Sequence, residues 1–190
     1  MEWKIPGTVL TCQKEEASSL RERFEGMFLG GDIALSQVMA ITGLEAHTIQ
    51  NWVKRGFVTS PKNKRYTLRQ LCRLLNIHAL QGSMSLDKIC TLLGYVNGRL
   101  NDEQDDIIDD TELYFLFLSL AVETDTLLQS GDRRKLLARA MESYTPPRPQ
   151  DKERVEKALS IMLTAYLAAR LQQKAEQMLF SLSNMANTRF

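Results

Sequence analysis

The stretch TGLEAHTIQNWVKRGFV, residues 42–58, decides how the chain is interpreted, because it joins a glycine turn to a short amphipathic helix. Ile49, Trp52 and Val53 are three and four positions apart, so they share one face of a helix. We predict that Trp52 fills a small core there. The polar side chains of the opposite face would then be exposed.

A second short helix precedes the turn. Apolar residues between Leu35 and Leu44 follow helical spacing, and Gly43 suits a helix end because it adopts positive φ at little cost. Two short helices with a tight turn between them form the helix-turn-helix of DNA-binding proteins, whose second helix enters the major groove. We therefore expect residues 47–54 to be a recognition helix.

A basic loop follows the recognition helix. Pro61 and Asn63 favour a turn with strand-friendly flanks, which predicts a small hairpin or extended loop that acts as a wing. Gln and Asn can pair with adenine, and Lys and Arg bind guanine or phosphate. Taken alone, the loop charges also fit a solvated surface. The candidate DNA-binding residues are His47, Thr48, Gln50, Asn51, Lys54, Arg55, Lys62, Lys64, Arg65 and Tyr66.

Further helical patterns place the remaining elements. The spacing predicts a helix within 14–29, a helix from Leu68 to Ile77, and one that Ser85 caps. In the second half we expect helices at 111–130, capped by Asp110 and stopped by Gly131, from Asp132 to about Tyr144, and from Asp151 to about Ala186. The last would be about 50 Å long, so its end should protrude.

Charge is unevenly distributed along the chain. Residues 45–98 carry +6, residues 99–132 carry −9 and residues 133–190 carry +6, although the net charge is +1. A basic segment can attract phosphate, although a charge block can also be a solvated face. The acidic run NDEQDDIIDD, at 101–110, reads as a linker or a charged lip of a second domain. We therefore expect a DNA-binding domain at 1–98 and a helical dimerisation or effector domain at 99–190.

Several classes of protein are disfavoured. The chain has no apolar run of membrane-spanning length and no secretory signal, and Cys12, Cys72 and Cys90 are widely spaced, so we expect a cytoplasmic protein. Two histidines and three dispersed cysteines offer no nucleophile–base pair. No phosphate loop or metal-ligand spacing is present. We expect no catalytic residues, no cofactor and no metal.

The order of these landmarks resembles a known family. LSQVMAITGL, TIQNWVKRGFV, KRYTLRQLCRLL and LQGSMSLDKICTLL, within about 33–95, are similar to the DNA-binding head of the MerR family. That head has Arg-Tyr-Tyr-Glu where this chain has residues 50–53, so a phosphate-binding Arg and a Tyr are missing. NWVKRGF followed by PKNKRY is more similar still to an uncharacterised bacterial family of unknown function. That family has a MerR-like head and a helical C-terminal half, and its regulatory role is presumed.

These patterns predict a mainly α-helical protein with a MerR-like winged helix-turn-helix head and an all-helical C-terminal half. We expect a transcriptional regulator that binds duplex DNA as a homodimer, paired mainly through the second half. The alternative is a protein-interaction adaptor whose head no longer binds DNA. The sequence does not identify an operator, a small-molecule effector or the sign of regulation.

Overall fold

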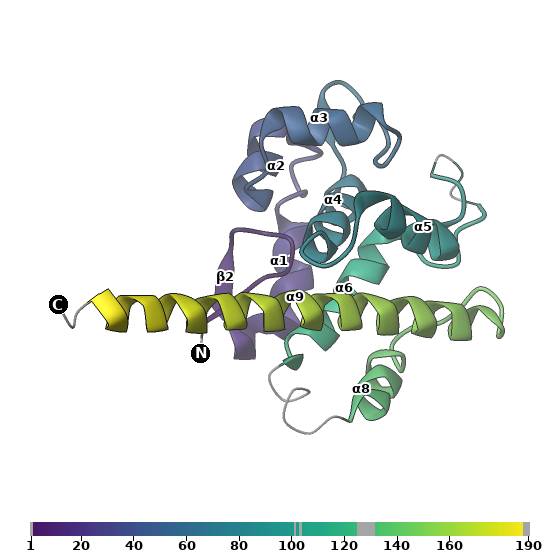
Figure 1. Cartoon of the computed structure of the whole chain (residues 1–190). Coiled ribbons are helices and arrows are strands. Elements are labelled where there is room, and N and C mark those ends of the chain that lie inside the picture. Colours follow the sequence, from purple (N-terminus) through teal and green to yellow (C-terminus); the bar gives the residue numbers. More distant parts are fainter. Residues whose placement is uncertain (1, 101, 103, 125–131, 188–190) are drawn as a thin grey trace.

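A computed structural model describes residues 2–100, 102, 104–124 and 132–187, with side chains described as far as residue 182. The fold is mainly helical, as predicted (Figure 1). Its elements are β1 (Glu2–Lys4), β2 (Thr11–Gln13), η1 (Lys14–Ser19), α1 (Leu20–Gly26), β3 (Ile33–Ala34), α2 (Leu35–Thr42), α3 (Ala46–Lys54), β4 (Arg65–Tyr66), α4 (Leu68–Leu80), α5 (Leu86–Asn97), α6 (Asp110–Ala121), α8 (Arg133–Ala140) and α9 (Asp151–Asn187).

An N-terminal hairpin, absent from the sequence-based expectation, covers one side of α4. Strands β1 and β2 are antiparallel, with Trp3 opposite Cys12 and both side chains buried. The turn between the strands contains Gly7 at φ 74°, and a Cβ atom there would lie 2.3 Å from the carbonyl oxygen of Leu75. The hairpin therefore approaches α4 so closely that this position needs glycine. The helix expected at 14–29 is shorter than predicted, since a 3-10 turn precedes α1.

Helices α2 and α3 form where the sequence predicted them, joined by three residues. The turn begins with Gly43 at φ 73°, where a Cβ atom would lie 2.3 Å from the Val9 side chain. At the end of α2, the Thr42 hydroxyl donates to the carbonyl of Val38 at 2.8 Å. Trp52 is 3% exposed, as expected for a core residue. The apolar face of α3 thus packs inward and leaves its polar face outside.

Helix α4 lies at the centre of the molecule. Thr67 and Gln70 form a capping box at its start, with the Thr67 hydroxyl accepting from the amide of Gln70. Most of its residues are buried on all sides. It packs against α2, α5, α6 and α9, so helices from both halves of the chain share its surface.

The acidic run at 101–110 is not a linker, because its second half packs into the core. Ile107 and Ile108 are buried, and the amide of Ile107 donates to the carbonyl of Val96 at 2.9 Å. Asp109, rather than Asp110, caps α6, since its carboxylate accepts from the amides of Thr111 and Glu112. The buried residues from both sides of position 98 form one cluster.

The Asp110 side chain is buried in the core, where it pairs with Arg73. The Arg73 Nη1 atom lies 3.2 Å from Asp110 Oδ1, and the two side chains are 6% and 4% exposed. Arg73 also donates to the carbonyl of Phe57 at 3.1 Å and to the amide oxygen of Asn97 at 3.4 Å. Burial raises the pKa of the Asp110 carboxyl, although Arg73 opposes this shift. This buried cluster joins the loop after α3, the end of α5 and the start of α6.

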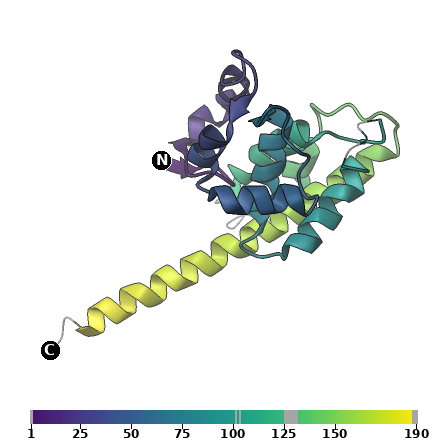
Figure 2. The ribbon, with the colours of Figure 1, turned by 90° about the horizontal axis from the view of Figure 1, so that it is seen from above.

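Helix α9 runs the length of the molecule and projects beyond it (Figures 1 and 2). Its bounds match the predicted helix closely, and the predicted protruding end is present. The first part is anchored by packing against α4, α5, α6 and α8. Every described side chain from Leu171 to Leu182 is exposed. Helix α8 ends at Ala140, earlier than predicted. Residues 125–130 of the helix expected at 111–130, and its expected stop at Gly131, lie outside the described residues.

Candidate functional site

Helix α3 lies at the top of the body in Figure 1, apart from α9. Ile49 and Trp52 are buried, whereas His47, Gln50 and Asn51 are exposed. The same face continues into Lys54 and Arg55, and Thr48 is half-buried beside it. Within the described part of the chain, the side chains of Gln50, Asn51 and Lys54 form no hydrogen bond or ion pair. Their donors and acceptors are therefore available to a ligand.

Arg55 differs from its neighbours because it already has contacts. Its guanidinium lies 4.4 Å from the centre of the Phe57 ring and 3.5 Å from a carboxylate oxygen of Asp87. Both ion-pair partners are exposed, so this contact is weak. Stacking on Phe57 holds the guanidinium flat against the surface. Arg55 is thus oriented by the protein, whereas Lys54 is unconstrained.

The basic loop is a tight hairpin, as predicted. Lys62 and Arg65 face each other, and the amide of Arg65 donates to the carbonyl of Lys62 at 2.8 Å. Asn63 and Lys64, the two residues between them, have φ values of 50° and 60°. This is the geometry of a type I′ turn, whose twist matches that of hairpin strands. The turn exposes the side chains of Lys62 and Lys64 at its tip.

Tyr66 does not belong to the exposed surface, which corrects the sequence-based assignment. It is 3% exposed, and burial raises the pKa of its phenol. Tyr66 lies opposite Ile33 in the β3–β4 ladder, so its ring packs beneath the hairpin. Arg65, the next residue outward, donates to the carbonyl of Asp32 at 2.9 Å. The β3–β4 pair therefore ties the hairpin to the segment that leads directly into α2.

The basic charge of residues 45–98 divides into an internal and an external part. Arg69 and Arg73 point inward, where Arg69 binds Asp106 and Arg73 binds Asp110. Burial raises the pKa of the Asp106 carboxyl to about 6, although Arg69 opposes the shift. The other basic side chains of this segment are exposed: Lys54, Arg55, Lys62, Lys64, Arg65 and Lys88. The exposed bases thus belong to α3, the hairpin and the start of α5.

Three buried polar residues behind this surface were not predicted from the sequence as a cluster: Arg73, Asn97 and Asp110. A usable signal existed for Arg73, because it interrupts the apolar run of α4 between Cys72 and Leu74. A charged residue at a position that helical spacing turns inward needs a partner of opposite charge. The acidic run supplies that partner, but nothing in the sequence pairs these two segments.

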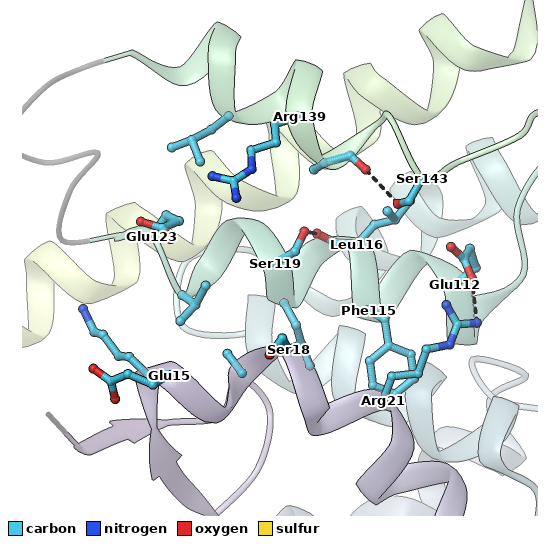
Figure 3. A pocket seen from close by; sticks show the side chains of 16 residues that line it. Glu15, Ser18, Arg21, Glu112, Phe115, Leu116, Ser119, Glu123, Arg139 and Ser143 are labelled. Atoms are coloured by element: carbon cyan, nitrogen blue, oxygen red, sulfur yellow. Dashed lines mark hydrogen bonds and ion pairs between the residues drawn. The ribbon is translucent and has the colours of Figure 1, made fainter.

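A separate cavity of about 470 Å³ lies between η1, α1, α6 and α8 (Figure 3). Arg21 forms an ion pair with Glu112 at 2.8 Å and lies over the Phe115 ring. The hydroxyls of Ser119 and Ser143 donate to carbonyls of their own chain segments, so they are not activated nucleophiles. The cavity has room for a small molecule.

Two further kinds of site were sought among the described residues: a metal site and a membrane-spanning helix. Across residues 2–100, 102, 104–124 and 132–187, no group of His, Cys, Asp and Glu gathers that could hold a metal ion. The three cysteines are free, with Cys12 and Cys72 buried. Among the described helices, none combines the length and the apolar character needed to cross a membrane.

Comparison with known proteins identifies one domain. A family described as "Domain of unknown function (DUF1836)" matches residues 32–117. The match begins just before β3 and ends within α6, so it includes α3, the hairpin and the Arg73–Asp110 pair, and it crosses the boundary expected at residue 98. Helix α9 lies outside it. The search of curated proteins gave no match, and the search of solved structures gave none.

Proposed function

We propose that the protein is a transcriptional regulator that binds duplex DNA through a MerR-like winged helix-turn-helix head. One observation carries the proposal: α3 buries its apolar face and leaves Gln50, Asn51 and Lys54 unbound on the surface. A helix with this exposed polar face, at the end of a three-residue turn, suits the major groove. In this proposal α3 reads base edges.

The hairpin serves as the wing. Its tip places Lys62 and Lys64 on a rigid type I′ turn, which suits contact with backbone phosphate beside the groove. Arg65 also belongs to this contact, although its guanidinium is partly engaged by Asp32. The Arg-Tyr-Tyr-Glu of the MerR head is absent, so distortion of DNA in the MerR manner is not part of the proposal.

The active form is proposed to be a homodimer that works in the cytoplasm. A single recognition helix contacts few bases, and dimers solve this by binding two half-sites. The described part of α9 from Leu171 onward has no contact with its own body that buries it, and several large apolar side chains there are exposed. A second chain is the proposed cover for these side chains.

Selection of bound fragments from a random duplex library with the purified full-length protein tests DNA binding. The affinity for a selected fragment should fall as salt rises, because phosphate contacts release counterions. In the variant Lys62→Gln/Lys64→Gln/Arg65→Gln, the slope of log K against log salt should shrink by about 0.9 per lost contact. A control with the same charge change, Arg134→Gln/Lys135→Gln/Arg139→Gln, alters exposed bases of α8, which lies far from α3 in Figure 1.

The control variant should keep the wild-type slope. An equal loss in both variants would mean that binding follows net charge rather than the wing. If no duplex binds at any salt concentration, the proposal fails and the adaptor becomes the better explanation, with the exposed part of α9 as the surface for its partner.

A further inference from the structure

Helix α9 has a second apolar face that runs along its solvent side. Its members are spaced alternately three and four residues apart, and all are exposed. We call this set the α9 seam: Ile161, Thr164, Ala168, Leu171, Ala175, Met178 and Leu182. Met178 and Leu182 are 61% and 63% exposed. A repeat of this spacing over three heptads is the pattern of a coiled-coil seam.

The α9 seam lies opposite the face by which α9 packs on its own body. The buried side of the helix contains Val155, Leu159, Met162 and Tyr166, all less than 8% exposed. At 100° per residue, the directions of these side chains centre roughly 180° from the seam. The seam therefore continues without a break from the anchored part of α9 to the projecting part. A partner can follow it for about 30 Å. At its anchored end the partner would lie beside Arg133 of α8, whose guanidinium donates to the Thr164 hydroxyl at 3.3 Å.

The composition of the projecting part argues for an apolar helical partner. Between Leu171 and Leu182 there is one base, Lys174, and one acid, Glu176. Nucleic acid or an anionic lipid surface would need a basic face, and this segment has none. A helix of this length with few stabilising side-chain pairs is marginal in water by itself. Packing of its apolar stripe against another helix would supply the missing stabilisation.

The order of small and large side chains in the seam matches a second copy of itself, placed antiparallel. In an antiparallel pair, position a of one helix faces position d of the other. With Leu171 facing Ala175 of the second copy, Ala168 faces Met178 and Thr164 faces Leu182. Each layer then contains one small and one large side chain, which fills space evenly.

A parallel pair would stack identical residues instead. Its layers would contain two Thr164, two Ala168 and two Ala175 side chains, which leaves gaps between layers of Leu and Met. The anchored half of α9 also favours the antiparallel arrangement. Each projecting segment would lie on the seam of a helix that its own body already holds in place, which lowers the cost of ordering.

We infer that two chains associate through the α9 seam as an antiparallel two-helix coiled coil, in which Met178 and Leu182 of each chain pack on Ala168 and Thr164 in the anchored half of the other chain's α9. This deepens the homodimer proposed above by naming its interface, and it does not depend on DNA binding. The interface is isologous, so pairing closes at two chains.

The first test measures the mass of the full-length protein by light scattering at micromolar concentration. The wild-type protein should have the mass of two chains, and Leu171→Glu/Met178→Glu should have the mass of one. A matched control, Gln173→Glu/Phe180→Glu, adds the same charges on the opposite side of the same segment and should remain a dimer. A wild-type monomer, a larger assembly or a dimeric seam variant would overturn the inference.

Disulfide trapping tests the orientation. In a Cys90→Ser background, Ala168→Cys alone should give no covalent dimer, because the antiparallel register separates the two positions by about 15 Å along the axis. Ala168→Cys together with Met178→Cys should give a covalent dimer under mild oxidation. Efficient trapping by Ala168→Cys alone would instead establish a parallel pair. Both experiments use the protein without DNA. A negative result for the dimer is therefore distinct from a negative result for DNA binding.

Discussion

The buried pair of Arg73 and Asp110 makes a sharp prediction about how the body is held together. Replacing Arg73 with Met keeps much of the side-chain volume but leaves the Asp110 carboxylate in the core without its partner. It also leaves the Phe57 carbonyl without the hydrogen bond from Arg73 at 3.1 Å. Removing one partner of a buried ion pair costs about 3–5 kcal/mol. That is a large part of the 5–15 kcal/mol typical of a whole domain.

The double variant measures the interaction energy between the two side chains, apart from the contacts that each makes with its surroundings. Asp110→Asn alone should also destabilise, because it leaves the Arg73 charge buried. Arg73→Met/Asp110→Asn should cost less than the sum of the two single changes, by about 2 kcal/mol, because neither unpaired charge remains. Urea unfolding followed by circular dichroism measures all four proteins. Additive costs would show that the two side chains do not stabilise each other, and would refute this account of the acidic run.

The pH dependence of Arg73→Met gives an independent check. Burial raises the pKa of the Asp110 carboxyl, and Arg73 opposes this, so removing Arg73 should raise the pKa further. A carboxyl with a raised pKa binds more protons in the folded state than in the unfolded state. Its folded form therefore loses stability as pH rises through the folded pKa. The variant should regain stability as pH falls from 7 toward 4, and a flat profile over that range would contradict the assignment.

Three further predictions concern single sites. Trp52→Ala should cost about 3–5 kcal/mol and lower the melting temperature sharply, whereas a stable variant that lost DNA binding would make Trp52 a contact residue. Gln50→Ala/Asn51→Ala should keep the fold but flatten sequence preference in the fragment selection, since a good base contact is worth about 1–3 kcal/mol; unchanged preference would disprove the assignment of α3. Because burial raises the pKa of Asp106 to about 6, stability should fall as pH rises from about 4 to 6, and Asp106→Asn should remove that part of the decline.

The segment from α2 to β4 was the most predictable part of the fold, because its signals are local. Gly43 marks the turn, and the spacing of Ile49 and Trp52 shows which face of α3 is buried. Pro61 and Asn63 predict the hairpin. Tyr66 shows the limit of this reasoning, since two exposed bases precede it and nothing local reveals that its ring is buried. Its burial follows from pairing with Ile33, more than thirty residues earlier.

The acidic run was misinterpreted for a related reason. A segment with many carboxylates and few apolar residues has the composition of a solvated linker. Its role depends on two arginines of α4 that are distant in sequence, and on the amides and carbonyls at the end of α5. Pairings over this distance leave no periodicity in either segment. The N-terminal hairpin was missed because strands of three residues carry too few side chains to alternate visibly.

The position of Arg73 relates the two proposed surfaces of the molecule to each other. Through Phe57 it contacts the loop that follows α3, and through Asp110 it contacts the start of α6, which packs on α9. Helix α4, which carries Arg73, also packs directly on α9. Helix α3 and the α9 seam are thus connected through the packed body rather than through a linker. In the proposed dimer, the two α3 helices would therefore keep one separation, so that DNA half-sites at a single spacing would fit best.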